Sequence, residues 1–180
     1  CIRDSSLAEH IAQTLGSSNF RPYVSDDPIG AEIGGAVKNV LAIACGIVHG
    51  RGLGENARAA IITRGLAEML RFGEKKGAQR DTLMGLSGLG DLILTCSSLQ
   101  SRNMSLGSAL GQGEKLSDIL KVRNSVSEGA FTAPILANIA KDLGVDMPIV
   151  QAVNAILNED LDVETAMRDL LSRPFKKEIH

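Results

Sequence analysis

Apolar residues recur every three or four positions along most of the chain, which is the period of an amphipathic helix. The clearest run covers residues 28–50, where Asp27 is the expected N-cap and Pro28 the first helical residue. Glycine and alanine between the larger residues make this helix thin, so it can pack closely against another helix or a ligand. Its predicted buried face consists of Ile33, Val37, Val40, Leu41, Ala44, Ile47 and Val48.

Similar patterns predict further helices downstream. A second long helix is expected over residues 55–76, with Gly77 as its stop. Shorter helices are expected near 104–110, 116–122, 128–143, from 148 onward, and at 163–171. The glycine-rich residues 85–92 are the stretch expected to be most irregular. The inward side of the second helix is predicted to hold Ala60, Ile61, Leu66, Met69, Leu70 and Phe72.

The first part of the chain follows a different pattern. Residues 7–15 predict a short amphipathic helix, and residues 20–24 predict a brief strand with Pro22 at an edge-compatible position. A lone helix and strand cannot form a stable sheet. We therefore expect residues 1–27 to belong to a larger α/β domain and residues 28–180 to form a helical domain.

Composition supports the helical expectation and excludes several classes of protein. Aromatic residues make up 3% of the chain and Trp is absent, which favours packed helices over a β-sandwich. The formal net charge is −2, and no basic run exceeds Lys176-Lys177, so a nucleic-acid partner is not expected. The longest apolar stretch, residues 40–48, is too short to span a bilayer. Three widely spaced cysteines and three scattered histidines suggest neither a disulfide framework nor a metal site, and fit a reducing cytoplasm.

Lys38 is the first candidate for chemistry. It lies inside a small, apolar helix, and no acidic residue is one turn away on either side. A partly buried Lys without a local partner has its charged form disfavoured, which suits it to proton transfer. The alternative is a Lys whose stem runs along the helix so that its ammonium reaches water.

Asp91 closes the run Gly85-Leu-Ser-Gly-Leu-Gly-Asp, in which three glycines allow a close backbone approach to a partner. The alternative is an ordinary N-cap Asp ahead of residues 92–95. The run is not a dinucleotide-binding fingerprint, because Ile93 stands where a third glycine is required and no strand precedes it.

Arg102 follows a polar loop and starts a predicted helix with Ser101 and Asn103. The planar guanidinium matches a phosphate, and the N–H groups at a helix start favour anions. A solvated surface Arg is the alternative. Residues 50–54, with three glycines, could also cradle a phosphate, or could simply be a turn between helices.

Several separate runs, in matching order and spacing over about residues 27–175, resemble bacterial NAD(P)-dependent glycerol-3-phosphate dehydrogenase. The resemblance implies an all-α, multi-helix dehydrogenase C-terminal domain, like that of 6-phosphogluconate dehydrogenase, behind a short α/β remnant of a Rossmann domain. The runs are Gly35-Ala-Val-Lys-Asn-Val40, Gly52-Leu-Gly54, Asn56-Ala-Arg-Ala-Ala60, Thr63-Arg-Gly-Leu-Ala-Glu-Met69, Gly85-Leu-Ser-Gly-Leu-Gly-Asp-Leu92, Leu94-Thr-Cys96, Ser101-Arg-Asn103 and Val126-Ser-Glu-Gly129.

The resemblance also implies roles at matching positions. Lys38 corresponds to the catalytic lysine, and Asp91 to an aspartate that contacts substrate and sets the lysine. Arg102 corresponds to a phosphate ligand that also neighbours the cofactor. The other implied substrate-binding residues are Asn39, Thr95, Ser101 and Asn103, and the other implied cofactor-binding residues are Val126 and Glu128.

The resemblance implies an enzyme with a nucleotide-binding half and a catalytic half, and this chain would be the catalytic half. Its substrate would be dihydroxyacetone phosphate or sn-glycerol 3-phosphate, and its cofactor NAD or NADP, bound mainly by a nucleotide-binding half with a Gly-x-Gly-x-x-Gly loop. A chain that starts at Cys1 is expected to be a cut chain and inactive alone. The resemblance further implies a homodimer in a bacterial cytoplasm that makes glycerophospholipid precursors.

Two other interpretations stay open at this point. One is a different two-domain dehydrogenase, of the ketopantoate or 6-phosphogluconate type, which would prefer carboxylated substrates. The other is a non-catalytic helical module that dimerises or binds a partner helix. The second interpretation predicts that changes at Asp91 and Arg102 leave ligand binding untouched.

Overall fold

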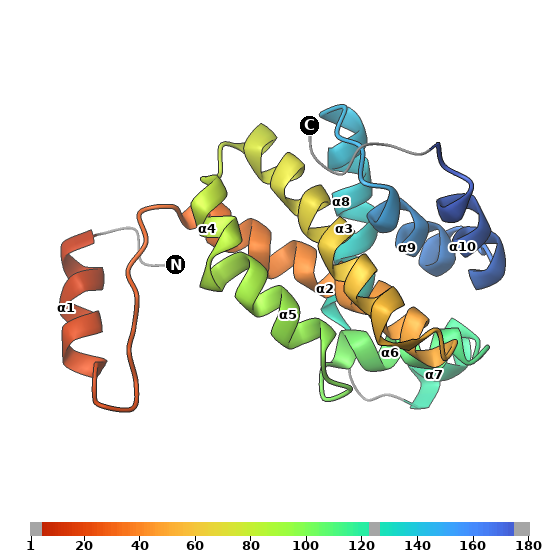
Figure 1. Cartoon of the computed structure of the whole chain (residues 1–180), viewed down its shortest axis with the longest axis horizontal. Coiled ribbons are helices and arrows are strands. Elements are labelled where there is room, and N and C mark those ends of the chain that lie inside the picture. Colours follow the sequence, from red (N-terminus) through yellow and green to blue (C-terminus); the bar gives the residue numbers. More distant parts are fainter. Residues whose placement is uncertain (1–4, 123–126, 175–180) are drawn as a thin grey trace.

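The computed structural model describes residues 5–122 and 127–174, and these form a bundle of helices with no strand (Figure 1). The predicted all-α fold is thus confirmed. The elements are α1 (Ser5–Leu15), α2 (Pro28–Gly50), α3 (Gly54–Lys76), α4 (Arg80–Met84), the π-helical turn η1 (Leu86–Gly90), α5 (Asp91–Cys96), α6 (Arg102–Gly111), α7 (Leu116–Val122), α8 (Glu128–Asp142), α9 (Pro148–Asn158) and α10 (Val163–Leu171).

Helix α2 is the centre of the bundle, and α3, α5, α6, α8 and η1 all pack against it (Figure 1). The predicted face of α2 is buried, but so are residues around the rest of its circumference, including Asn39, Ile43 and Cys45. A helix covered on all sides needs small residues, which explains its glycines and alanines. The single-face prediction for α2 was therefore too narrow.

Asp27 starts α2 as predicted. Its Oδ1 accepts the Gly30 N–H at 2.8 Å, and its Oδ2 accepts the Gln79 N–H at 2.8 Å, which joins the start of α2 to the α3–α4 loop. Burial alone would raise the pKa of Asp27, but these two N–H bonds and a hydrogen bond from the Thr82 side chain more than offset it and lower the pKa. The cap therefore stabilises the fold above the ordinary carboxyl pKa and is lost in acid.

Helix α2 is also the one helix among the described residues that is long and apolar enough to cross a membrane. Its most apolar window has a mean hydropathy of 1.5, and 67% of that window is buried inside the bundle. Residues 40–48 alone were too short for a span, but the complete helix passes the length test. Its central place among the other helices accounts for this apolar length.

The contact of α2 with α6 is unusually close. A Cβ atom added to Gly46 would lie 2.1 Å from the Met104 carbonyl oxygen, and one added to Gly107 would lie 2.0 Å from the Ile43 carbonyl oxygen. Neither position can hold a side chain, so the two backbones touch directly. This contact fixes α6, and with it Arg102 at its first position, relative to α2.

Three predictions for the early and middle parts of the chain were wrong, and one helix was missed. Residues 20–24 form no strand, and one isolated bridge joins Ser17 and Phe20, because the described chain offers no neighbouring strand to pair with. The glycine-rich stretch is not irregular but continues through η1 into α5. Helix α4 was not predicted, and Ala60, expected inside, is exposed.

Other helix boundaries agree with the predictions to within a few residues. Gly77 ends α3 in the left-handed conformation with φ 82°, as expected for a helix stop. Helix α1 has no buried residue and stands apart from the bundle at the end of a non-helical segment (Figure 1). Among the described residues, the hydrophobic core therefore lies entirely from α2 onward.

Candidate functional site

Lys38 and Asp91 meet across the interface of α2 with α5. The Lys38 ammonium donates a hydrogen bond to the Asp91 carboxylate, although the residues are 53 positions apart in the chain. The side chains are 21% and 33% exposed, so the pair is partly sheltered and still open to a ligand. Lys38 has no acidic neighbour one turn away in its own helix, and its partner comes instead from α5, at the aspartate that the resemblance associates with the lysine.

Close packing of the glycine-rich turn places Asp91 there. A Cβ atom on Gly34 of α2 would lie 2.2 Å from the Ser87 carbonyl oxygen, so η1 rests directly on the α2 backbone. Asp91 is the first residue of α5 rather than its N-cap, since Gly90 takes the cap position and no side chain caps this helix. The N-cap interpretation of Asp91 was therefore wrong, and its carboxylate is available to Lys38.

Thr95 holds Asp91 from the next turn of α5. Its hydroxyl donates to the Asp91 carbonyl oxygen at 2.7 Å and lies 3.5 Å from Asp91 Oδ1. Cys96, the neighbour of Thr95, points into the core. A hydrogen bond with Cys45 and then burial raise the pKa of the Cys96 thiol, which favours its neutral form.

Asn39, the residue after Lys38, belongs to a second polar contact that joins α2, α6 and α8. Asn103 Nδ2 donates to Asn39 Oδ1 at 3.0 Å, and Asn103 Oδ1 accepts the Gly129 N–H at 2.9 Å. Both amides are buried. A Cβ atom on Gly129 would lie 2.6 Å from the Asn39 carbonyl oxygen, so only glycine fits where α8 approaches α2.

Arg102 is the first residue of α6 and lies beside the start of α8. The Ser127 hydroxyl donates to the Arg102 carbonyl oxygen at 3.1 Å, and the Arg102 guanidinium is 3.7 Å from Glu128 Oε1. Ser101 caps α6, because its hydroxyl accepts the Met104 N–H. The Arg102 side chain is 60% exposed. This exposure is compatible with a phosphate ligand and also with the alternative of a solvated surface arginine.

The predicted residues thus fall into two groups whose members touch one another. The first is Lys38, Asp91 and Thr95, and the second is Asn39, Asn103, Arg102 and Glu128. Consecutive residues 38 and 39 of α2 link the groups, while Ser101 uses its hydroxyl as a cap. Val126, also predicted, lies outside the described residues.

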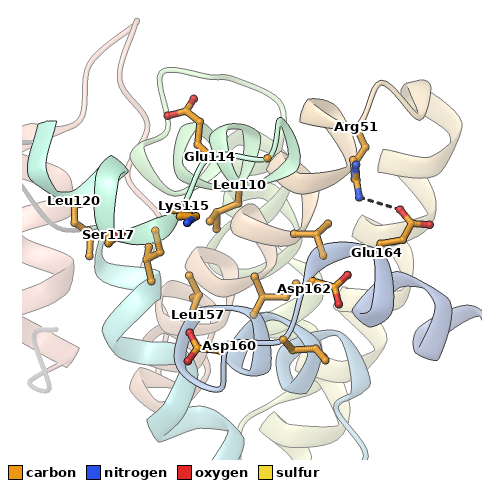
Figure 2. Close-up of a pocket in the computed structure, with 15 residues that line it drawn as sticks. Arg51, Leu110, Glu114, Lys115, Ser117, Leu120, Leu157, Asp160, Asp162 and Glu164 are labelled. Atoms are coloured by element: carbon orange, nitrogen blue, oxygen red, sulfur yellow. Dashed lines mark hydrogen bonds and ion pairs between the residues drawn. The ribbon is translucent and has the colours of Figure 1, made fainter.

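The turn at residues 50–54 is not part of this arrangement. Arg51 forms an ion pair with Glu164 of α10 at 2.9 Å, at the rim of a pocket of about 830 Å³ (Figure 2). That pocket lies between the α6–α7 segment and the α9–α10 segment, and none of the predicted site residues lines it. Within residues 5–122 and 127–174, no cluster of three or more His, Cys, Asp or Glu side chains is arranged to hold a metal ion.

Reasoning from spacing alone missed two features of the site. It did not pair Lys38 with Asp91, because the two are far apart along the chain, although the family resemblance implied that this aspartate sets the lysine. Ser127 was also overlooked, although a Ser directly ahead of Glu128 and Gly129 is a usual helix-start pattern. Its hydroxyl bonds to Arg102 instead of capping α8.

Comparison with known proteins identifies the family of the chain. Residues 27–168 match the family model described as NAD-dependent glycerol-3-phosphate dehydrogenase C-terminus. The chain is 61% identical over 170 residues to glycerol-3-phosphate dehydrogenase [NAD(P)+] of Erythrobacter litoralis, covering 94% of this chain and 51% of the relative. It is 57% identical over 175 residues to the protein of that name from Rhodospirillum rubrum, covering 97% of this chain and 50% of the relative.

Solved structures agree with the sequence matches. The chain is similar to glycerol-3-phosphate dehydrogenase of Coxiella burnetii, with a TM-score of 0.89 and 44% identity over 94% of this chain and 52% of that one. The corresponding yeast structure gives a TM-score of 0.81 and 28% identity over 92% of this chain and 48% of that one. The chain spans about half the length of the relatives it matches. It belongs to the family of the C-terminal domain of NAD-dependent glycerol-3-phosphate dehydrogenase.

Proposed function

We propose that this chain is the substrate-binding and catalytic half of sn-glycerol-3-phosphate dehydrogenase. It would interconvert dihydroxyacetone phosphate and sn-glycerol 3-phosphate, with NAD or NADP as the hydride carrier. The observation that carries the proposal is the partly sheltered Lys38–Asp91 pair in a chain of this family. The chain on its own would not turn over substrate.

Lys38 is the proposed general acid and base. When a hydride reaches the carbonyl carbon of the ketone, negative charge grows on the carbonyl oxygen. An ammonium beside that oxygen stabilises the charge and then donates its proton, and acid catalysis of this kind contributes about 10²–10⁴-fold. The 21% exposure of the Lys38 side chain is compatible with contact to a bound ligand.

Asp91 and Thr95 would position this lysine. The Asp91 carboxylate attracts the ammonium, and the Thr95 hydroxyl restricts the carboxylate from the same helix. Such fixed geometry saves the cost of reorganising polar groups during the reaction. Asp91 would also contact the substrate through the oxygen that Lys38 leaves open.

Arg102 would bind the substrate phosphate. Its guanidinium stands at the N-terminal end of α6, where the helix also favours an anion. Holding the distant phosphate keeps the carbonyl in line for the reaction at Lys38. We assign supporting substrate contacts to Asn39, Ser101 and Asn103 in the same region.

Most of the cofactor would be bound outside this chain. The described residues contain no strand followed by a glycine-rich loop and a helix, which is the usual site for a dinucleotide. The residues of this chain that would approach the cofactor are Arg102, Val126 and Glu128. The cofactor supplies or accepts the hydride, and this chain supplies the proton and the phosphate contact.

We also assign residues 1–27 to the end of the nucleotide-binding domain and residues 28–180 to the helical domain. The exposed helix α1 and the family match from residue 27 support this boundary. The setting would be a bacterial cytoplasm, where buried free thiols such as Cys45 and Cys96 stay reduced. There the enzyme, a homodimer, would supply glycerophospholipid precursors.

The test is dihydroxyacetone-phosphate-dependent oxidation of NADH and NADPH. It compares this chain alone with a fusion that places the amino-terminal half of the Erythrobacter litoralis relative ahead of it. We expect activity in the fusion and none in the chain alone. A well-folded fusion that oxidises NAD(P)H with a carboxylated ketone, or with no substrate at all, would contradict the proposal.

A further inference from the structure

The Glu128 carboxylate lies between two partners that the mechanism uses. Its Oε1 is 3.7 Å from the Arg102 guanidinium, and its Oε2 accepts a hydrogen bond from Asn39 Nδ2 at 3.3 Å. Asn39 is fixed in turn by the buried Asn103 amide. The carboxylate is therefore directed at Arg102 rather than turned freely into solvent.

The surroundings of Arg102 favour an anion. Arg102 is the first residue of α6, a helix of ten residues, and Glu128 is the first residue of α8, a helix of fifteen. Positive helix ends and a guanidinium together attract negative groups. The Glu128 carboxylate is an anion that lies in these surroundings, 3.7 Å from the guanidinium.

We propose that Glu128 is an internal competitor for the phosphate site: its carboxylate pairs with Arg102 and leaves the guanidinium when a phosphate monoester binds. The inference rests on the proposed function, since it takes Arg102 as the phosphate ligand. Glu128 acts through Arg102 and so determines how tightly the site binds phosphate. It does not take part in the reaction itself.

The Arg102–Glu128 ion pair is weak enough for a phosphate to displace. The Arg102 and Glu128 side chains are 60% and 70% exposed, and exposed pairs of this type shift an equilibrium by a factor of about five at most. A phosphate with a charge near −2 can displace a weak pair like this one. The same weakness means that removing the carboxylate leaves the fold intact.

The first experiment measures the binding of inorganic phosphate to this chain by calorimetry at low ionic strength. Glu128→Gln is compared with the unsubstituted chain, and Glu128→Ala serves as a second variant. We expect both variants to bind phosphate about two- to five-fold more tightly. The gain should shrink as salt is added, because salt screens exposed charges.

Glu114→Gln is the matched control, because Glu114 is an exposed glutamate in the α6–α7 loop and its loss changes net charge by the same amount. It should leave phosphate affinity unchanged. An equal gain in this control would mean that net charge, and not Glu128, sets the affinity. Weaker binding by Glu128→Gln would mean that Glu128 supports Arg102, and would also overturn the inference.

A double substitution separates competition at Arg102 from general repulsion. In an Arg102→Gln background, Glu128→Gln should no longer improve phosphate binding, since no guanidinium is left to compete for. An undiminished gain would overturn the inference and leave the proposed function standing. Absence of phosphate binding in every variant would overturn it as well, whereas the proposed function is decided separately by the activity of the fusion.

Discussion

The contact between α2 and α6 has two parts with opposite chemistry. In its middle, Gly46 and Gly107 bring the backbones together with no side chain between them. At the start of α6, the helices meet through the Asn39 and Asn103 amides, which also reach α8. The first part is apolar and permits a single arrangement, whereas the second buries polar groups at a cost unless each is paired. The glycine contact fixes the position of α6 relative to α2, and the amide contact places polar groups beside the candidate site.

The largest effect is expected when a larger side chain replaces a glycine in the contact between α2 and α6. In Gly107→Val, the new Cβ would lie 2.0 Å from the Ile43 carbonyl oxygen, so the two helices must separate. We expect a loss of about 3 kcal/mol or more in the free energy of unfolding, measured by urea titration. The control is Gly35→Ala, where an added Cβ meets nothing within 4 Å. It should stabilise α2 by about 0.5–1 kcal/mol, and equal unfolding midpoints in the two variants would contradict the close contact.

A substitution of Lys38, beside the amide contact, should instead lower turnover and leave the stability of the fold unchanged. Lys38→Ala in the fusion with a nucleotide-binding half should lower turnover by about 10²–10⁴-fold, because the proton donor is lost. Its urea midpoint should stay near that of the unsubstituted protein. Lys141→Ala, at an exposed position on α8, is the matched control and should keep full turnover. Turnover that survives in Lys38→Ala would remove Lys38 from the mechanism.

Glu68 shows what a buried polar group does away from the candidate site. It accepts the N–H groups of Ile149 and Val150 at the start of α9, yet burial raises its pKa from 4.5 to about 7. Between these values the folded chain binds a proton that the unfolded chain does not, so stability should fall as pH rises from about 4.5 to 7. The change should be on the order of 3 kcal/mol.

The measurement for Glu68 is a series of urea titrations from pH 5 to pH 8, compared with Glu68→Gln. The glutamine cannot ionise, so this part of the pH dependence should vanish in the variant. Subtracting the two curves removes the contribution of other carboxylates, including Asp27, which acts in the opposite direction. Parallel curves would show that Glu68 does not titrate in this range.

The smallest effect concerns the amide contact itself. Asn103→Ala removes both bonds of a buried amide and leaves Asn39 Oδ1 and the Gly129 N–H without that partner. A loss of about 1–3 kcal/mol in unfolding free energy is expected, again by urea titration. Asn138→Ala, at an exposed position on α8, should cause no loss. If the two variants have the same free energy of unfolding, the amide contact does not stabilise the fold.

The sequence by itself determined the helices and where most of them begin and end. As residues that start and end helices, Asp27, Pro28 and Gly77 act on neighbouring backbone groups, so this role is visible in the order of residues, unlike the bond of Asp27 to the distant Gln79 N–H. The resemblance of several short runs also gave the family, which the comparisons then confirmed. Residues 20–24 show the limit of local pattern, because a strand exists only where a second strand pairs with it.

Only the tertiary structure decided which polar groups touch. Lys38 and Asp91 are 53 positions apart, and Asn39 and Asn103 are 64 apart. Their pairing depends on how closely η1 and α6 approach α2, and that approach is set by glycines whose contact partners lie in distant segments. The sequence could name these residues as candidates. The resemblance implied that Asp91 sets the lysine, but nothing in the sequence showed that Glu128 faces Arg102, because that contact follows from packing between distant segments.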